Sequence, residues 1–220
     1  MDRRGGLVAR VYLHRRFAIL FYSLLLTLVA APTSGALGVD AGLLELFLAA
    51  NLLIAMASVG GERSRWALLL IVLILWAARA ATLWLGHPLV ALIGLGIWTL
   101  LGLFAAGAAL RFAMRTRSVG GEHIYAALSA YLLVGILFGF LYWILQQAWP
   151  ASFAIADGLS RMSAIYFSFI TLDTLGYGDI APRSDIARGL AMLEGVGGQL
   201  FLAVLIARLV SAYRQSDGEP

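Results

Sequence analysis

Apolar residues run along this chain in long blocks, and short polar links between the blocks hold most of the charged residues. A bilayer core is crossed by roughly 20 residues of helix. Six blocks approach this length, at about 17–32, 41–59, 66–85, 88–110, 121–147 and 187–212. A further apolar stretch, at about 162–172, is too short to span and lies between the last two blocks. The pattern predicts an all-α membrane protein with six transmembrane helices and one re-entrant helix.

The composition supports a membrane protein and excludes several kinds of site. Hydrophobic residues fill 61% of the 220 positions, charged residues fill 13%, and the mean hydropathy is +0.89. A soluble domain is about half apolar and a quarter charged, so this chain has too little polar surface to coat itself in water. Because the chain has neither cysteine nor lysine, disulfides, thiolate metal sites and lysine chemistry are excluded.

The distribution of arginine predicts the orientation in the membrane. Arginines gather before the first block, at 60–65 and at 111–117, whereas the links 33–40 and 86–87 have none. This alternation follows the positive-inside rule. We therefore expect a multi-pass protein with both termini in the cytoplasm, no cleaved leader, and an outward-facing region at 148–186.

The chain is predicted to consist of a four-helix unit followed by a pore unit. The first covers residues 1–118, the second covers 119–214, and 215–220 form a short tail. A tail of this length leaves no room for a cytoplasmic ligand-binding domain in this chain.

The stretch Thr174-Leu-Gly-Tyr-Gly-Asp179 follows the re-entrant helix and carries the candidate chemistry. Alternating glycines permit backbone conformations that other residues resist. Successive carbonyls can then point the same way, and several chains around one axis would form stacked rings of carbonyl oxygens that replace the water shell of a cation. The preceding helix, at about 160–173, would direct the partial negative charge of its C-terminal end toward that cation.

This hexapeptide resembles the Thr-Val-Gly-Tyr-Gly-Asp signature of potassium channels, with Leu175 in place of valine. The resemblance is strong over about 160–212, loose over 121–147, and only a matter of helix count over 1–118. It implies a homotetramer in the cell membrane, surrounded by lipid, that conducts K⁺ as its permeant ion without a cofactor. The residues that would coordinate K⁺ are Thr174, Leu175, Gly176, Tyr177 and Gly178.

The resemblance also assigns roles around this filter. Asp179 would lie at the outer mouth, where the hydroxyl of Tyr166 on the pore helix could brace it. Gly198 would let the inner helix bend. The residues that would line the cavity below the filter are Gln199, Leu202 and Ile206.

Three further residues depart from the family pattern. Asp173 stands where threonine is usual, and four copies would either ring the inner entrance and concentrate cations or serve as structural hydrogen-bonding groups. Glu194 is an intramembrane carboxyl that needs a partner or water, and it would either tune gating or bond to the pore helix. Ile170 replaces a glutamate of several bacterial channels, so their inactivation behaviour cannot be transferred.

The four-helix unit lacks the pattern of a voltage sensor. Voltage sensors carry arginine at every third position of their fourth segment, whereas 88–110 contains none. Arg79 lies at about the depth of Glu45 if each helix rises ~1.5 Å per residue, which predicts a structural ion pair. On the fifth segment, Gly135 and Gly139 form a GxxxG motif that predicts close helix packing.

The sequence leaves three functions open. The first is a potassium-selective channel without strong voltage sensing. The second is a weakly selective cation channel, in which Asp173 alters the inner end of the filter. The third is a silent or modulatory subunit that carries no flux alone. We expect no enzyme and no nucleic-acid partner, because the sequence offers no nucleophile–base pair, metal cluster or phosphate-binding loop.

Overall fold

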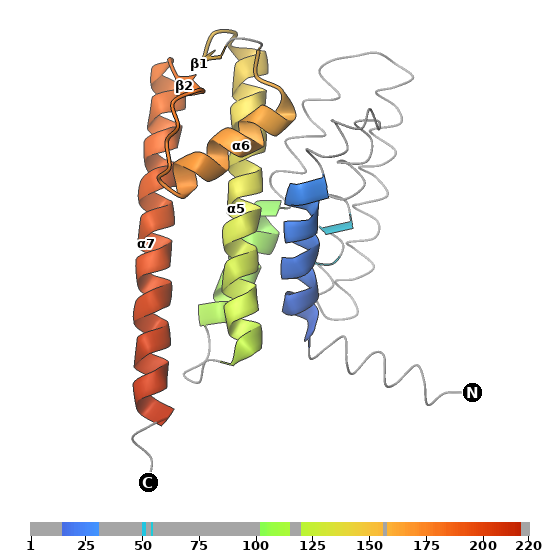
Figure 1. The fold of residues 1–220 in the computed structure, drawn as a ribbon, viewed down its shortest axis with the longest axis vertical. Coiled ribbons are helices and arrows are strands. Elements are labelled where there is room, and N and C mark those ends of the chain that lie inside the picture. The colour runs from blue at the N-terminus through green and yellow to red at the C-terminus, as the bar shows by residue number, and fades with distance from the viewer. Residues whose placement is uncertain are drawn as a thin grey trace, which may run out of the picture. The chain divides into compact units, whose positions relative to one another are not determined.

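The computed structural model describes residues 15–30, 50, 51, 54, 102–114, 120–155 and 158–216, and these residues are mostly helical (Figure 1). They form two compact units, which are divided within α5 between residues 133 and 134. The predicted functional boundary at 118/119 is a different division and stays a prediction. The labelled elements are α5 (Gly121–Ala148), β1 (Phe153–Ala154), α6 (Arg161–Leu172), β2 (Ala181–Pro182) and α7 (Asp185–Ser216).

In the first unit, residues 15–30 form a helix that is joined to the start of α5 by polar and aromatic contacts. The carboxylate of Glu122 accepts the backbone N–H of Phe17 at 3.0 Å, and the rings of Phe21 and Tyr125 have centroids 5.7 Å apart. The acidic side chain therefore satisfies a backbone donor near the start of the first helix. Most of the predicted blocks 41–59, 66–85 and 88–110 lies outside the described residues, as does the predicted ion pair of Arg79 with Glu45.

In the second unit, three helices account for the last part of the hydrophobic pattern. Among the described residues, α5 and α7 are long and apolar enough to cross a membrane. They confirm the predicted blocks 121–147 and 187–212 as helices. Helix α6 has 12 residues, so it confirms the prediction of a helix too short to span.

Two glycines allow α5 to approach α6 closely. A Cβ atom at Gly139 would lie 2.6 Å from the Cα of Ile165, and one at Gly135 would lie 2.7 Å from the ring of Phe169. A larger residue at either position would force the helices apart. The close packing predicted from the GxxxG motif is therefore confirmed, and its partner is the short helix.

The core of the second unit contains three rings packed edge to face. The centroids of Tyr142 and Phe167 are 5.0 Å apart, and Phe153 lies 5.4 Å from each of them. This geometry brings the positive edge of one ring against the negative face of another. The other buried members of the core are Leu145, Leu159, Ala164, Ile170, Ile180 and Ala187.

A pair of two-residue strands joins the outer ends of the unit, and the hydrophobic pattern does not predict it. Strands β1 and β2 are antiparallel, with Phe153 opposite Pro182 and Ala154 opposite Ala181. Next to them, the carbonyl of Ser152 accepts the backbone N–H of Arg183 at 2.8 Å. The chain that leaves the candidate filter is thereby tied to the loop that follows α5.

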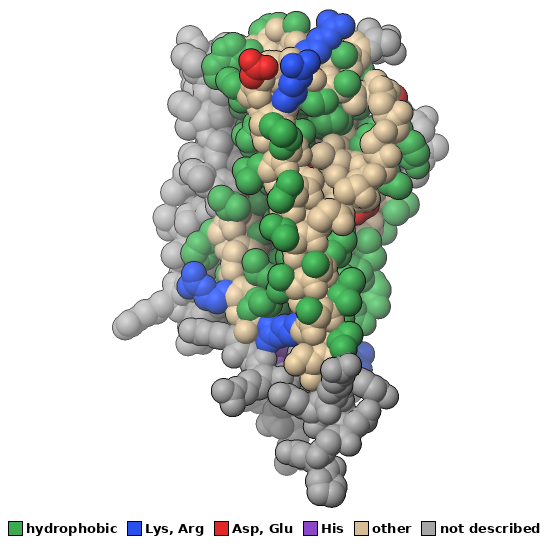
Figure 2. All heavy atoms as spheres, turned by 90° about the vertical axis from the view of Figure 1, so that its left-hand side faces the viewer, with side chains coloured by type: hydrophobic (Ala, Val, Ile, Leu, Met, Phe, Trp, Pro, Cys, Tyr) green, Lys and Arg blue, Asp and Glu red, His purple; other side chains and the backbone are tan. Residues whose placement is uncertain are grey.

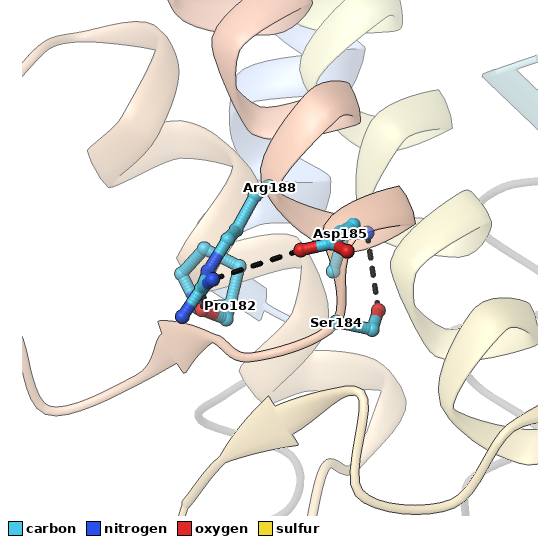
Figure 3. A network of polar contacts seen from close by, with 5 residues as sticks. Pro182, Ser184, Asp185 and Arg188 are labelled. Carbon is cyan, nitrogen blue, oxygen red and sulfur yellow. Dashed lines mark hydrogen bonds and ion pairs between the residues drawn. The ribbon is translucent and has the colours of Figure 1, made fainter.

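Helix α7 starts directly after this tie (Figure 3). The hydroxyl of Ser184 accepts the backbone N–H of Ala187 at 3.2 Å, as an N-cap does. Asp185 lies in the first turn and pairs with Arg188 at 3.7 Å, although both side chains are exposed. The acidic residue also complements the positive end of the helix.

Gly198 brings α7 against the end of α6. A Cβ atom at this position would lie 2.9 Å from the carbonyl oxygen of Leu172 and 2.8 Å from its Cδ1. Helix α7 continues through Gly198, so its predicted role as a hinge stays a prediction. Its packing role follows from the contact with Leu172.

Replacing Gly198 with alanine should destabilise the fold, because the backbone of Leu172 cannot rotate away from the added methyl group. We expect Gly198→Ala to lower the free energy of unfolding by about 1–3 kcal/mol, measured by denaturant unfolding in detergent micelles. Gly195→Ala is the matched control, since its Cβ would lie 3.8 Å from the Thr171 carbonyl, an ordinary contact. Equal losses in the two variants would show that close packing is not the role of Gly198.

Candidate ion-conduction site

The last turn of α6 fixes the start of the candidate filter. Helix α6 begins after Ser160, whose side chain accepts the backbone N–H of Ser163 at 3.0 Å. At its other end, the carbonyl of Ile170 accepts the backbone N–H groups of Leu175 and Gly176, at 2.8 and 3.2 Å. These bonds satisfy a carbonyl that the helix would otherwise leave without a partner. They also make the position of the filter depend on the position of α6.

The sign of φ alternates along the backbone of the candidate filter. The φ angles of Thr174, Gly176 and Gly178 are +59°, +53° and +84°, whereas Leu175 and Tyr177 have no positive φ. Glycine adopts a positive φ without steric cost, but for Thr174 it costs roughly 1–2 kcal/mol. Such alternation is the backbone pattern that can turn successive carbonyl groups to one side of a chain. Their role in binding a cation stays a prediction.

The whole filter is open on the surface of the single chain. Every residue of 173–179 is exposed, including the large side chains of Leu175 and Tyr177, which are 57% and 69% exposed. Their exposure contrasts with Leu172 and Ile180 on either side, which are 1% and 5% exposed. The segment is thus anchored at both ends and uncovered between them.

At the outer end, Tyr166 on α6 lies near enough to Asp179 for the two side chains to interact electrostatically. The predicted brace between them stays a prediction. An open recess at this end is lined by Gly178 and Arg183, together with residues of β1.

At the inner end, Asp173 is the C-terminal cap of α6. Its backbone N–H donates to the carbonyl of Phe169 at 2.9 Å, and its side chain is exposed. A negative side chain at a helix C-terminus is unfavourable for the helix, because the terminus itself carries a partial negative charge. The stability of α6 therefore does not explain why this residue is acidic.

Glu194 is buried at a point where three helices meet. Its Oε2 atom accepts the hydroxyl of Tyr142 on α5 at 2.6 Å, and its Oε1 atom is hydrogen-bonded to the hydroxyl of Ser168 on α6. The Ser168 hydroxyl is also 2.6 Å from the carbonyl of Gly135 on α5. The bond to the pore helix is one of the two roles predicted for Glu194. The sequence does not predict which residues bond to Glu194. A polar Ser168 within an apolar helix is the one feature of α6 that points to such a contact.

The predicted cavity residues lie on α7, where Gln199 and Ile206 are exposed and Leu202 is half-buried. Figure 2 shows hydrophobic side chains along one face of α7, with charged side chains toward its ends. The exposed apolar residues of this helix are Ile186, Met192, Leu193, Val196, Leu200, Val204, Ile206 and Val210. The roles of these residues in a cavity or gate stay predictions.

The comparison with protein families matches residues 127–215 to a family described as ion channel. The match covers α6, the filter and nearly all of α5 and α7. No solved structure shows a significant match to the chain.

Several curated proteins are similar to parts of the chain. The "Probable potassium channel protein 2" of Methanocaldococcus jannaschii is 38% identical over 60 residues, which are 26% of this chain and 18% of that protein. The "Two pore potassium channel c" of Oryza sativa subsp. japonica is 32% identical over 91 residues, or 40% and 18%. The chain thus spans under a fifth of these two relatives. "Protein LctB" of Bacillus caldotenax is 30% identical over 102 residues, or 43% of this chain and 75% of that protein.

These matches identify an ion channel domain and no enzyme family. Together with the apolar helices α5 and α7, they make this a membrane protein. The match to Protein LctB covers three quarters of that protein, and other relatives are named as potassium channels. The chain belongs to the potassium channel family.

Proposed function

We propose that four copies of this chain surround a pore that conducts K⁺ selectively and passively across the cell membrane. The observation that carries the proposal is the alternating backbone of 174–178, held at its inner end by the carbonyl of Ile170. Carbonyl oxygens turned to one side of each chain would replace the hydration shell of K⁺ on the axis of the assembly. The hydroxyl of Thr174 would add one more ring of oxygens at the inner end.

The exposure of the filter supports an assembly of several chains. Non-helical backbone at membrane depth is tolerated only where it is covered by protein or lines a water-filled space. The filter of a single chain is exposed throughout, so neighbouring copies and the conduction path are the surroundings that suit it. If each copy contacts the next in the same head-to-tail way, the copies close into a ring. The number four comes from the resemblance of the filter to that of potassium channels.

The membrane topology is part of the proposal. Each chain would cross the membrane six times, with both termini in the cytoplasm, as the distribution of arginine predicts. The segment 88–110 contains no arginine, so the four-helix unit would sense voltage weakly or not at all. No cofactor is needed for passive conduction.

A second candidate, a weakly selective cation channel, is favoured by one observation. Asp173 is exposed at the C-terminal end of α6, where its charge adds to that of the helix terminus. A strong negative field at the inner end of the filter attracts cations of any kind. Selectivity would then depend on the carbonyl rings alone.

The test of the main proposal is cation flux into liposomes that hold the purified protein. Barium-sensitive flux of K⁺, with little flux when Na⁺ is the only cation, would support a potassium-selective channel. Comparable K⁺ and Na⁺ flux would favour the weakly selective channel. A confirmed tetramer without flux of any ion would contradict conduction by this chain alone and favour a silent subunit.

Gly176→Ala should abolish selective K⁺ flux, because a side chain disfavours the φ of +53° that this position adopts. The expected strain is roughly 1–2 kcal/mol in each chain, which is enough to rearrange the carbonyl groups. Gly121→Ala is the control, since it makes the same chemical change at an exposed position with open space around it. If Gly176→Ala retained both flux and K⁺ over Na⁺ preference, the filter would lie elsewhere.

Asp173→Asn should weaken block by internal barium, because it removes negative charge near the inner end of the filter without changing the size of the side chain. We expect the blocking concentration to rise by about tenfold or more for loss of several charges. Asp185→Asn is the matched control, because Asp185 is an exposed aspartate at the other end of the unit. Unchanged barium block in Asp173→Asn would assign Asp173 a structural role instead.

A further inference from the structure

The hydroxyl of Ser168 faces two acceptor atoms but carries one proton. One acceptor is the carbonyl of Gly135, at 2.6 Å, and the other is Oε1 of Glu194. A serine hydroxyl has one O–H group to donate, although its oxygen can also accept. A single proton makes one short, nearly linear hydrogen bond, so it serves only one of these two acceptors at full strength. The other contact then needs a proton from elsewhere.

The hydrogen-bond contacts around Glu194 need more protons than the two hydroxyl groups supply. Tyr142, Ser168, Glu194 and the Gly135 carbonyl make three hydrogen-bond contacts. An ionised Glu194 supplies no proton, so the two hydroxyl groups would have to fill three contacts. A protonated carboxyl satisfies all three: Tyr142 donates to Oε2, Oε1–H donates to Ser168, and Ser168 donates to Gly135.

The burial of these groups argues against an ionised Glu194. Glu194 is 1% exposed, and Tyr142 and Ser168 are 0% exposed, so solvent does not reach the contacts. Both groups that bond to the carboxyl are neutral hydroxyl groups, Tyr142 on α5 and Ser168 on α6. Of the two, only Tyr142 can titrate. An ionised carboxylate without a cationic partner is costly at membrane depth. Protonation removes that cost.

We propose that Glu194 is a neutral carboxylic acid in the folded protein, and that it acts as a positioning residue which holds the pore helix between α5 and α7. Ser168 is the contact on α6, and it lies two residues before Ile170. The carbonyl of Ile170 in turn holds the start of the filter through Leu175 and Gly176. Loss of the Glu194 proton leaves one contact unfilled and loosens the helix that carries the filter.

Two variants separate a neutral acid from an ionised one. Glu194→Gln keeps a donor and an acceptor on one planar group, so its N–H can donate to Ser168 while its carbonyl accepts from Tyr142. It should keep the fold, whereas Glu194→Ala leaves the buried hydroxyl of Tyr142 without its acceptor. Asp185→Asn makes the same acid-to-amide change on α7 at a fully exposed position, and it is the control.

The direct test is infrared difference spectroscopy at neutral pH on the full-length wild type and Glu194→Gln. The wild type should show the carbonyl band of a protonated carboxyl, which shifts in D₂O, and Glu194→Gln should lack this band. Asp185→Asn should retain it. Absence of the band from the wild type would overturn the proposal, and this readout does not require that the protein conduct any ion.

The positioning role of Glu194 rests on the proposed channel activity, and it is tested by measuring K⁺ flux as the pH rises. Wild-type flux should fall by about tenfold once the carboxyl ionises, since one buried hydrogen bond is lost in each chain. Glu194→Gln should lose this dependence, and Asp185→Asn should keep it. The same alkaline fall in Glu194→Gln would contradict the positioning role. Absence of flux in every protein, with the infrared band present, would instead contradict the channel function and leave the neutral acid established.

Discussion

The second unit depends on holding the short helix α6 at a fixed position within an apolar core. Lipid tails are as apolar as leucine, so hydrophobic burial alone does little to hold one membrane helix against another. Helix α6 is held instead by contacts that require specific partners. Gly139 lets the backbone of Ile165 approach α5, and Ser168 bonds to groups on both α5 and α7. The edge-to-face ring of Phe167 adds a third constraint on its orientation.

The geometry of the filter follows from that position. A chain that alternates between positive and negative φ has no repeating hydrogen bonds of its own, so both of its ends need outside support. At the start of the filter, the carbonyl of Ile170 supplies this support through its bonds to Leu175 and Gly176. After the filter, Ile180 is buried and the paired strands fasten the returning chain to the loop after α5. Support at both ends is what allows Thr174 to keep a φ that costs a non-glycine residue energy.

The sequence predicts the features that the membrane or the backbone imposes, and it misses those that depend on helix rotation. The lengths of α5 and α7 follow from bilayer thickness, and the alternation in 174–178 follows from where glycine stands. The sequence also predicts that Glu194 needs a partner or water, since a carboxyl within an apolar block must avoid lipid. Its partners, Tyr142 and Ser168, depend on which helix faces meet. Strands β1 and β2 are too short to have a periodic pattern.

Two acidic side chains near α6 have opposite surroundings, although the sequence places both within apolar stretches. Asp173 is exposed at the C-terminal end of the helix. Glu194 is enclosed by hydroxyl groups against the middle of the same helix. The field at the start of the filter would then come from Asp173 and the end of the helix, because a neutral Glu194 adds no charge. If both proposals hold, one carboxyl holds α6 in place and the other acts on cations.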